Sequence, residues 1–285
     1  MPDQPRPAAP PPRPTPPAAN PAGPLHGFTD VDAQPTPTDW VAVLDRLASE
    51  PFYAAYKRRI RQLLQPHPGG RYLEVGAGTG TDAAQLAADT DATVVAVDRA
   101  HTMLSTARDR GVPHVVLADA HQLPFADHAF GGVWADRVLQ HLTDPEHALD
   151  ELIRVTTPAG RLVVADPDYD TQVLDLADQQ LARRVLRFRA DRMLRHGTLA
   201  HRHAGLLAAR GLTDIQVEAP TLVVRDPHVV DNVMGLRTWA QTASQQGVLT
   251  HAQAQAWTSQ LDQAVAEGRF TYAVTFFITA ATTPA

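Results

Sequence analysis

The sequence predicts an α/β fold: a Rossmann-like, mostly parallel sheet of seven strands with helices on both faces and a helical lid. Short apolar runs alternate with stretches of helical period, as in strands joined by crossover helices. The run at 71–75 breaks into alternating glycines and the run at 93–97 ends in Asp98, and both suit buried parallel strands. With 285 residues and a hydrophobic share of 44%, the chain can form one large domain with an appended lid, or two small domains.

A proline-rich tail is expected before the domain. Residues 1–37 contain 13 of the 24 prolines and almost no large apolar side chain, which predicts a disordered or polyproline-like segment. The domain would then occupy 38–285 and begin with two amphipathic helices within 38–68. The first is expected from Thr38, with Asp39 as an alternative cap.

Three glycines follow the first strand, directly before a helix that is expected to begin at Thr81. Such a turn needs glycine because the backbone bends sharply and approaches a ligand with no Cβ in the way. A dinucleotide fingerprint would require glycine in place of Thr81, and the carboxylate of Glu74 would repel a pyrophosphate. A ligand with an ammonium group removes this objection, since Glu74 can hold it while the N–H groups of the loop bind a carboxylate.

In this acid followed by G-x-G-x-G, the sequence resembles the class I S-adenosylmethionine-dependent methyltransferases, in particular their ubiquinone/menaquinone-methylase-like (type 11) branch. The resemblance covers roughly residues 38–220, with four motifs in the order of the family. It implies the cofactor S-adenosyl-L-methionine, whose methionine end carries both an ammonium and a carboxylate. The cofactor residues that it implies in this turn are Glu74, Gly76, Ala77, Gly78 and Gly80.

The second strand brings in the ribose and adenine side of the implied site. Asp98 stands at the tip of this strand, where the family places the acid that accepts both ribose hydroxyls. Arg99 and Met103 follow on the next helix, where the family often packs a side chain on the adenine. Core packing is an equally good interpretation of Met103.

The third and fourth strands supply the last implied cofactor residues. Residues 119–125 resemble the family's D-A-x-x-L-P-F stretch, in which Asp119 would meet the adenine amino group and the N–H of Ala120 a ring nitrogen. A loop cap is the alternative role of Asp119. Asp136 follows the strand at 130–135 and completes the set.

Two residues are candidates for catalysis. His141 ends a stretch that the resemblance places near the transferable methyl group, and a histidine titrates near working pH. Asp166 follows the fifth strand, expected at 162–165, and could orient His141 or act as the base itself. The alternative is a histidine that only shapes its loop.

Acids and tyrosines are candidates for the substrate site. Asp168 and Tyr169 could position a substrate hydroxyl or amine, with a solvated acidic turn as the alternative. Tyr53 and Tyr56 lie on a helix of the kind that closes over the pocket in the resembled family, although packing is their more common role. No metal is expected, because the acids come from one loop.

The C-terminal half is expected to complete the sheet and supply the lid. A helix over 145–155 begins at the cap Asp144, and strands are expected near 215–217 and 270–280. The stretch 174–196 is rich in arginine, most of which suits a solvated helix face. The helical segments 171–197 and 228–262 are expected to cover the substrate.

Composition limits the partners. A net charge of -6 argues against a nucleic-acid partner, and the absence of cysteine excludes disulfides and thiolate chemistry. No signal peptide or membrane-spanning stretch is evident, so the protein is expected to be cytoplasmic and not to associate with a membrane. Low lysine content and abundant alanine, arginine and proline are typical of proteins from GC-rich, actinobacteria-like genomes. This composition favours a substrate from secondary metabolism. The oligomeric state stays open.

The sequence therefore predicts a methyltransferase that acts on an O, N or C acceptor of a small molecule, such as a natural-product or quinone-like intermediate. Two alternatives stay open. One is a nicotinamide-dependent oxidoreductase, which Glu74 and Thr81 oppose. The other is a catalytically silent partner that binds S-adenosylmethionine and regulates or scaffolds another protein.

Overall fold

A computed structural model describes Phe28 and residues 30–285, and the predicted tail up to residue 27 lies outside the described residues. Its centre is a sheet with the strand order β3-β2-β1-β4-β5-β8-β6, and β7 pairs with β8 beside this path. The strands are β1 (Arg71–Val75), β2 (Thr93–Asp98), β3 (Val115–Leu117), β4 (Phe130–Asp136), β5 (Thr156–Leu174), β6 (Thr213–Glu218), β7 (Thr221–Val224) and β8 (Tyr272–Thr282). The predicted mostly parallel sheet is confirmed, and β7 is an unexpected addition.

The strands β3, β2, β1, β4 and β5 run parallel, whereas β8 runs antiparallel to β5, β6 and β7. The α-helices are α1 (Pro37–Ser49), α2 (Pro51–Leu63), α3 (Thr81–Thr90), α4 (His101–Asp109), α5 (Pro145–Val155), α6 (Gln179–Phe188), α7 (His203–Ala208), α8 (Pro227–Met234), α9 (Trp239–Gln245) and α10 (His251–Ala266). None of the described helices combines the length and apolar character that a membrane-spanning segment requires.

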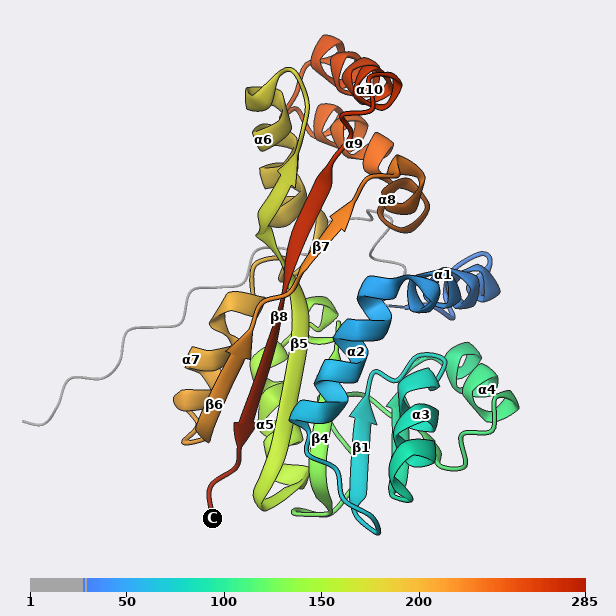
Figure 1. The fold of residues 1–285 in the computed structure, drawn as a ribbon, viewed down its shortest axis with the longest axis vertical. Coiled ribbons are helices and arrows are strands. Elements are labelled where there is room, and N and C mark those ends of the chain that lie inside the picture. The colour runs from blue at the N-terminus through green and yellow to red at the C-terminus, as the bar shows by residue number, and fades with distance from the viewer. Residues whose placement is uncertain (1–27, 29) are drawn as a thin grey trace, which may run out of the picture.

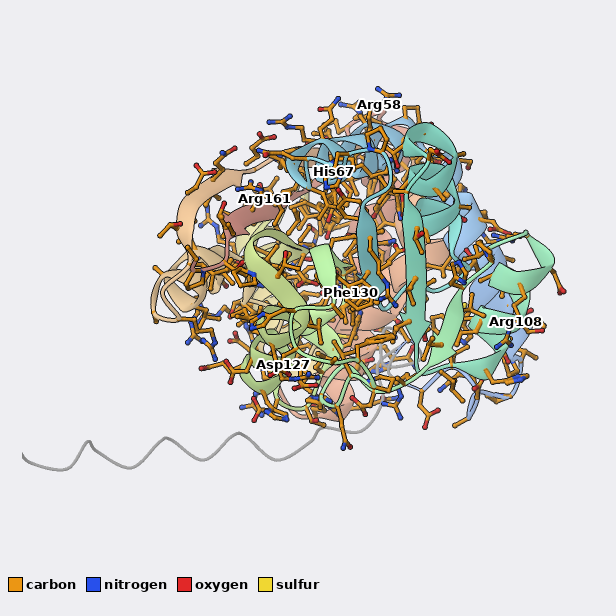
Figure 2. All side chains as sticks on the ribbon, turned by 90° about the horizontal axis from the view of Figure 1, so that it is seen from below. Arg58, His67, Arg108, Asp127, Phe130 and Arg161 are labelled. Carbon is orange, nitrogen blue, oxygen red and sulfur yellow. The ribbon has the colours of Figure 1, made fainter. Side chains whose placement is uncertain are left out.

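Helices cover both faces of the sheet (Figure 1). Alternate residues of a strand face opposite sides, and in β1 both sets are buried: Tyr72 packs with α2 and α3, while Leu73 and Val75 pack with α5 and α7. In the view from below, Phe130, at the start of β4, lies near the centre of the outline, whereas Arg58 and Arg108 lie toward its edge (Figure 2). The chain thus has a buried sheet between two helical layers.

The helix ends follow the sequence signals closely. At the start of α5, the side chain of Asp144 accepts a hydrogen bond from the N–H of His147 at 3.0 Å, and Pro145 occupies the first helical position. This confirms the predicted cap. Helix α1 begins at Pro37, one residue before the predicted start, because proline suits the first turn of a helix.

Strand β5 is much longer than predicted, whereas β8 has the predicted length and lies two residues later than expected. The two strands pair from Arg161↔Thr282 to Leu174↔Tyr272, with an irregularity between Asp168 and Val173. The fifth strand was expected to end at 165, but β8 supplies hydrogen bonds that carry it on to Leu174. Residues 171–174 of the expected helical lid are therefore strand, and the extension carries α6, α9 and α10 beyond the rest of the sheet (Figure 1).

The end of the predicted tail is packed against the domain. Val31 is buried with Ala100 and Met103. The carboxylate of Asp32 accepts hydrogen bonds from the N–H groups of His101 and Thr102, at 2.6 and 3.1 Å, at the start of α4. The prediction of a disordered segment up to 37 is therefore wrong for the described residues 30–36, because Val31 and Asp32 give them an apolar anchor and a helix cap.

Candidate active site

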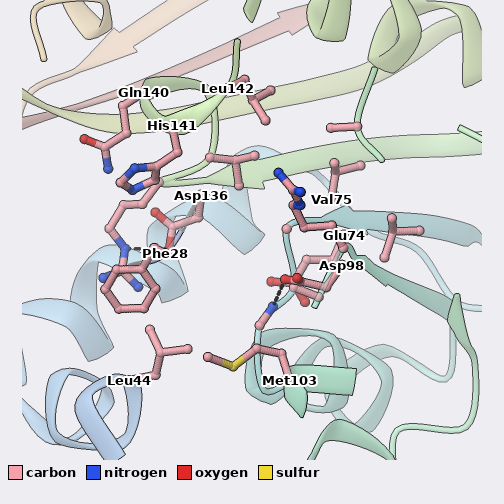
Figure 3. Close-up of a pocket in the computed structure, with 18 of the residues that line it drawn as sticks. Phe28, Leu44, Glu74, Val75, Asp98, Met103, Asp136, Gln140, His141 and Leu142 are labelled. Carbon is pink, nitrogen blue, oxygen red and sulfur yellow. Dashed lines mark hydrogen bonds and ion pairs between the residues drawn. The ribbon is translucent and has the colours of Figure 1, made fainter. Parts of the chain in front are cut away.

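A cavity of about 340 Å³ opens at the carboxyl ends of β1, β2 and β4, where open α/β sheets bind ligands. The predicted cofactor residues that line it are Glu74, Gly76, Ala77, Gly78, Asp98, Arg99, Met103, Asp119, Ala120 and Asp136. Figure 3 shows Asp98 and Met103 on one side of the cavity and Gln140 and His141 on the other. The sheet edge thus brings together the acids that follow three strands.

The glycine turn leaves the cavity open to a ligand. Gly76 and Gly78 have positive φ angles of 71° and 53°, which side chains with a Cβ rarely adopt. The N–H of Gly78 donates to Oδ2 of Asp98 at 2.8 Å, and the N–H of Ala77 donates to the carbonyl of Val97 at 2.8 Å. These two bonds fasten the turn to the end of β2.

Gly80 has a different role from the one that the resemblance implies. It is not among the residues that line the cavity, and it caps the N-terminus of α3 with φ 70°. A Cβ added there would lie 2.8 Å from both the Cβ of Ala107 and Cγ2 of Val112. Gly80 is therefore needed where α3 packs closely on α4, and its assignment to the cofactor site is corrected.

Asp98 presents a constrained carboxylate to the cavity. Its Oδ1 accepts a hydrogen bond from the N–H of Ala100 at 2.9 Å, in addition to the bond from Gly78. Burial raises the pKa of Asp98, and the hydrogen bonds from these two backbone groups only partly offset this rise. Each carboxylate oxygen keeps a lone pair for a ligand.

Glu74 is buried in the wall of the cavity, with 4% of its surface exposed. Its Oε2 accepts a hydrogen bond from the N–H of Ala83 at 2.9 Å, in the first turn of α3. Burial, followed by the negative charge of Asp82, raises the pKa of Glu74 well above its usual range. A cationic ligand group would favour the ionised form.

A cluster of charges that the sequence analysis missed lies beside Glu74. Lys57 forms an ion pair with Asp82, and its Nζ lies 3.5 Å from Oδ2 of Asp136. Arg61 also binds Asp82, at 2.7 Å. Burial lowers the pKa of Lys57, but the charges of Asp82 and Asp136 outweigh it and leave this pKa above its usual value. The sequence does contain a pattern that could have predicted this cluster. One face of α2 carries residues spaced four apart, namely Tyr53, Lys57 and Arg61.

Asp119 lies at the rim of the cavity with a half-exposed side chain. Its Oδ1 accepts from the backbone N–H of His121 and lies 2.6 Å from Nδ1 of that histidine. Although burial raises the pKa of Asp119, the hydrogen bonds with His121 outweigh it and lower the pKa overall. The loop-cap role is therefore present, and the cavity-lining position remains compatible with a ligand contact.

His141 lies on the predicted side of the cavity, at the end of the 3-10 helix η2 (Leu139–His141). Its N–H donates to the carbonyl of Val138 at 2.9 Å, and its ring lies 6.3 Å from that of Phe28, centroid to centroid. Phe28 in turn packs edge-on against Trp40, with the centroids 4.5 Å apart. The segment before α1 thus closes the cavity over His141.

The structure does not place Asp166 in the cavity. Because β5 continues, alternate residues face opposite sides of the sheet: Pro167 and Tyr169 line the cavity, whereas Asp166 and Asp168 do not. Oδ2 of Asp166 instead lies 3.6 Å from Nε2 of His203, and both side chains are almost fully buried. The interpretation of Asp166 as a base or as the partner of His141 is therefore corrected.

Asp168 is also a structural residue. Its side chain is buried and accepts hydrogen bonds from the N–H of Asp170, at 3.1 Å, and of His201, at 3.0 Å. Its Oδ2 lies 2.6 Å from Nδ1 of His201. Nothing of this carboxylate reaches the cavity, so its assignment as a substrate residue is wrong. Within the described part of the chain, no group of three or more metal-ligating acids and histidines occurs.

The tyrosines divide in the same way. Tyr53 and Tyr169 line the cavity, whereas Tyr56 does not and donates its hydroxyl to Oδ1 of Asp136 at 2.6 Å. Tyr56 therefore positions an acid of the cavity wall and makes no direct contact with the cavity. Among the side chains that the structure describes, which leave out those of residues 232–234, none from the expected lid segment 228–262 lines the cavity, and Arg195 is the contribution of the other lid segment, 171–197.

The fold and the cavity at the carboxyl edge of its sheet are those of an enzyme with a nucleotide cofactor, and the comparisons with known proteins agree with this class. A family of methyltransferase domains matches residues 73–164. An uncharacterised 37.1 kDa protein in transposon Tn4556 of Streptomyces fradiae is 34% identical over 249 residues, covering 85% of this chain and 71% of that protein. The demethylmenaquinone methyltransferase of Corynebacterium glutamicum is 40% identical over 119 residues, 42% of this chain and 50% of the enzyme.

Among solved structures, phosphoethanolamine N-methyltransferase 2 of Haemonchus contortus, in complex with S-adenosyl-L-methionine, has the same fold. It aligns with a TM-score of 0.59 at 19% identity over 90% of this chain and 60% of that one. The chain spans about half the length of the Corynebacterium relative. The chain belongs to the class I S-adenosylmethionine-dependent methyltransferases, in their type 11 branch, and its cofactor is S-adenosyl-L-methionine.

Proposed function

We propose that this chain transfers a methyl group from S-adenosyl-L-methionine to an oxygen, nitrogen or carbon atom of a small molecule. The observation that carries this proposal is that the glycine turn, the acids at the ends of β1 and β2, and His141 line one cavity. The relation to a demethylmenaquinone methyltransferase favours a quinone-like or natural-product ring as the acceptor. The net charge of -6 favours a free small molecule over nucleic acid.

The residues of the cofactor half fit this ligand. Glu74 would hold the ammonium of the methionine part. The turn 76–80 would hold its carboxylate through N–H groups other than those of Ala77, Gly78 and Gly80, which have acceptors within the fold. Asp98 would accept the ribose hydroxyls, because its lone pairs face the cavity. The adenine would lie against the residues at the ends of β2 and β3, which are Arg99, Met103, Asp119 and Ala120. When bound, the cofactor supplies a methyl group on a positively charged sulfur.

The other half of the cavity, the acceptor half, would orient the acceptor and remove its proton. His141 can take a proton from an oxygen or nitrogen nucleophile, or from a carbon centre after transfer, at an imidazole nitrogen. Tyr53, Tyr169 and Phe276 supply apolar rings that position an acceptor. Phe28 and Val31, from the segment before α1, close the cavity and exclude water.

Isothermal calorimetry with S-adenosylhomocysteine and with NADH tests the cofactor. We expect S-adenosylhomocysteine to bind and NADH not to bind. Asp98→Ala should lower the affinity about 10- to 100-fold, because a charged hydrogen-bond acceptor is lost. Asp89→Ala, at an exposed position of α3, is the matched control and should bind as the wild type does.

Methyl transfer to a panel of phenols, amines and β-dicarbonyl compounds tests the activity separately. Turnover of any of these acceptors with release of S-adenosylhomocysteine supports the proposal. Binding of S-adenosylhomocysteine without transfer across the panel would instead favour a silent partner, and uptake of NADH alone would favour an oxidoreductase.

A further inference from the structure

The acceptor half of the cavity is unusually cationic. Its lining from α2, β5 and β8 is aromatic, namely Tyr53, Tyr169 and Phe276, but two arginines, Arg137 and Arg195, line the cavity with them. Apolar rings alone would suit a neutral acceptor. The arginines therefore require an explanation of their own.

Arg137 is held in an uncommon backbone conformation. It directly follows β4 with φ 56°, a left-handed value that is rare for a residue with a long side chain, and its N–H donates to the carbonyl of Ala165 at 2.7 Å. The guanidinium lies over the ring of Tyr53, 5.1 Å from its centroid. Such conformations persist where surrounding structure fixes them, often at functional sites.

The carboxylate beside Arg137 does not fully compensate its charge. Nε of Arg137 lies 3.6 Å from Oδ2 of Asp136, which is too long for a hydrogen bond, and this buried Nε has no hydrogen-bond partner among the described residues. The same Asp136 oxygen lies 3.5 Å from Nζ of Lys57, and the other oxygen accepts from Tyr56. One carboxylate is therefore shared between two cations and a hydroxyl.

The neighbouring carboxylates do not balance the positive charge around Arg137. Asp82 is itself shared between Lys57 and Arg61, so that Asp82 and Asp136 face three cations. Glu74 lines the cofactor half of the cavity, where its charge would be paired with the ammonium of the cofactor. Arg195, exposed at the rim, makes no hydrogen bond or ion pair with another described residue. The acceptor half thus carries net positive charge and unused N–H donors.

We propose that the acceptor carries an anionic group, such as a carboxylate, that Arg137 holds inside the cavity and Arg195 attracts at the rim, while an aromatic body packs on Tyr53, Tyr169 and Phe276. Arginine is suited to this role because its planar guanidinium binds oxyanions with two parallel hydrogen bonds. The inference rests on the proposed methyl transfer and narrows the class of acceptor.

Binding of a matched pair of probes to the protein saturated with S-adenosylhomocysteine tests this inference. 2-Naphthoate and 2-naphthamide have the same aromatic body and differ in charge. We expect calorimetry to show that 2-naphthoate binds about 10- to 100-fold more tightly than 2-naphthamide, the range of a hydrogen-bonded charge. Arg137→Gln should abolish this preference, and Arg195→Gln should reduce it.

Arg58→Gln is the control, since Arg58 is exposed on α2 and lies at the edge of the molecule (Figure 2). It should keep the full preference for 2-naphthoate. Affinity for S-adenosylhomocysteine, measured on each variant, shows that the site is intact. Equal binding of the two probes by the wild type would overturn the inference, as would a preference that survives Arg137→Gln.

A third outcome would also overturn it. If Arg137→Gln lowers the affinity for S-adenosylhomocysteine itself, Arg137 binds the carboxylate of the cofactor and not an acceptor. Failure of the wild type to bind S-adenosylhomocysteine would contradict the proposed function instead, so the two failures are distinguishable.

Discussion

A glycine in a ligand-binding turn can serve the ligand or the packing of the helix behind it, and Gly80 serves the packing. The Cβ of an alanine there would overlap Ala107 and Val112. Gly76 and Gly78 lie in the same motif and line the cavity, although a Cβ at Gly76 would also overlap the side chain of Val138. All three glycines have positive φ angles, so backbone conformation explains each of them equally well. The spacing of the motif therefore does not reveal which glycine faces the cavity and which one faces a neighbouring helix.

Gly80→Ala should therefore lower the free energy of unfolding, with little effect on cofactor affinity. Gly268→Ala is the matched control, since Gly268 has a similar φ of 67° but no atom within 4 Å of an added Cβ. The overlap at Gly80 should cost about 1–3 kcal/mol more than the control. Urea denaturation measures the difference, and equal losses in the two variants would contradict the packing role.

His141 is the side chain in the cavity best suited to take a proton. His141→Ala should retain affinity for S-adenosylhomocysteine and lower kcat about 100-fold or more, the usual contribution of a general base. His114→Ala, at an exposed position, should leave both quantities unchanged. Single-turnover methyl transfer measures the effect. Full activity of His141→Ala would leave the histidine with only a shaping role.

The cofactor residues could be predicted because each follows an apolar run, and the ends of parallel strands meet at one sheet edge. The roles of Asp166 and Asp168 could not, because the sequence after 165 contains acids and Pro167 and so resembles a turn. Pairing with β8, more than 100 residues away, keeps it extended. Which acid faces the cavity then depends on strand register, which the local sequence does not reveal.

At the scale of elements, the extension of β5 and β8 holds a helical lobe around one buried arginine. Arg189, in a π-helical turn after α6, is 1% exposed. Its guanidinium lies 4.1 Å from the ring centroid of Tyr169 and 4.3 Å from that of Trp239. It also donates to Oε1 of Gln172 at 2.8 Å. The other arginines of 174–196 are exposed, as predicted for most of them, and Arg189 is the exception.

Arg189→Ala should destabilise the protein by about 2–4 kcal/mol, because it removes two desolvated cation–π contacts and leaves a cavity. Arg187→Ala is the control two residues away. Arg187 is exposed and pairs only with Asp191 four residues on, so its loss should change the unfolding midpoint little. Equal midpoint shifts in the two variants, measured by urea denaturation, would contradict this role.

The type of each element could be predicted where the hydrophobic residues recur with a clear helical or strand periodicity, as in α2, α5 and the first four strands. The arrangement of the helical lobe could not be predicted, because the cation–π contacts of Arg189 join β5, the turn after α6 and α9 across 70 residues of sequence. An arginine-rich helix with no visible partner in the sequence suggests a solvated face. Only the tertiary fold shows which arginine is turned inward.

At the scale of the whole molecule, stability should depend on pH through the buried pair of Asp166 and His203. Burial, followed by the charge of Asp136, raises the pKa of Asp166 well above its usual value. Burial lowers the pKa of His203 to about 4. Burial therefore favours the neutral form of both side chains in the folded protein, whereas in the unfolded chain both are charged near pH 5.

Asp166→Asn isolates the contribution of the acid. Well below the usual pKa of an aspartate, about 3.9, Asp166 is protonated in both states, so the variant and the wild type should have similar stability. As the pH rises above this value, the unfolded chain loses the proton more readily than the folded one, so the wild type loses stability that the amide does not lose. Thermal midpoints from pH 4 to 8 should show a growing advantage of Asp166→Asn. Asp109→Asn, at an exposed position, should show none.

The charge cluster of α2 has one more consequence, for how the protein can be observed. Lys57 is the sole lysine of the 285 residues, and its amine lies in the wall of the cavity. Incorporation of ¹³C,¹⁵N-lysine would therefore label a single side chain, whose chemical shifts would report directly on what enters beside Asp82 and Asp136.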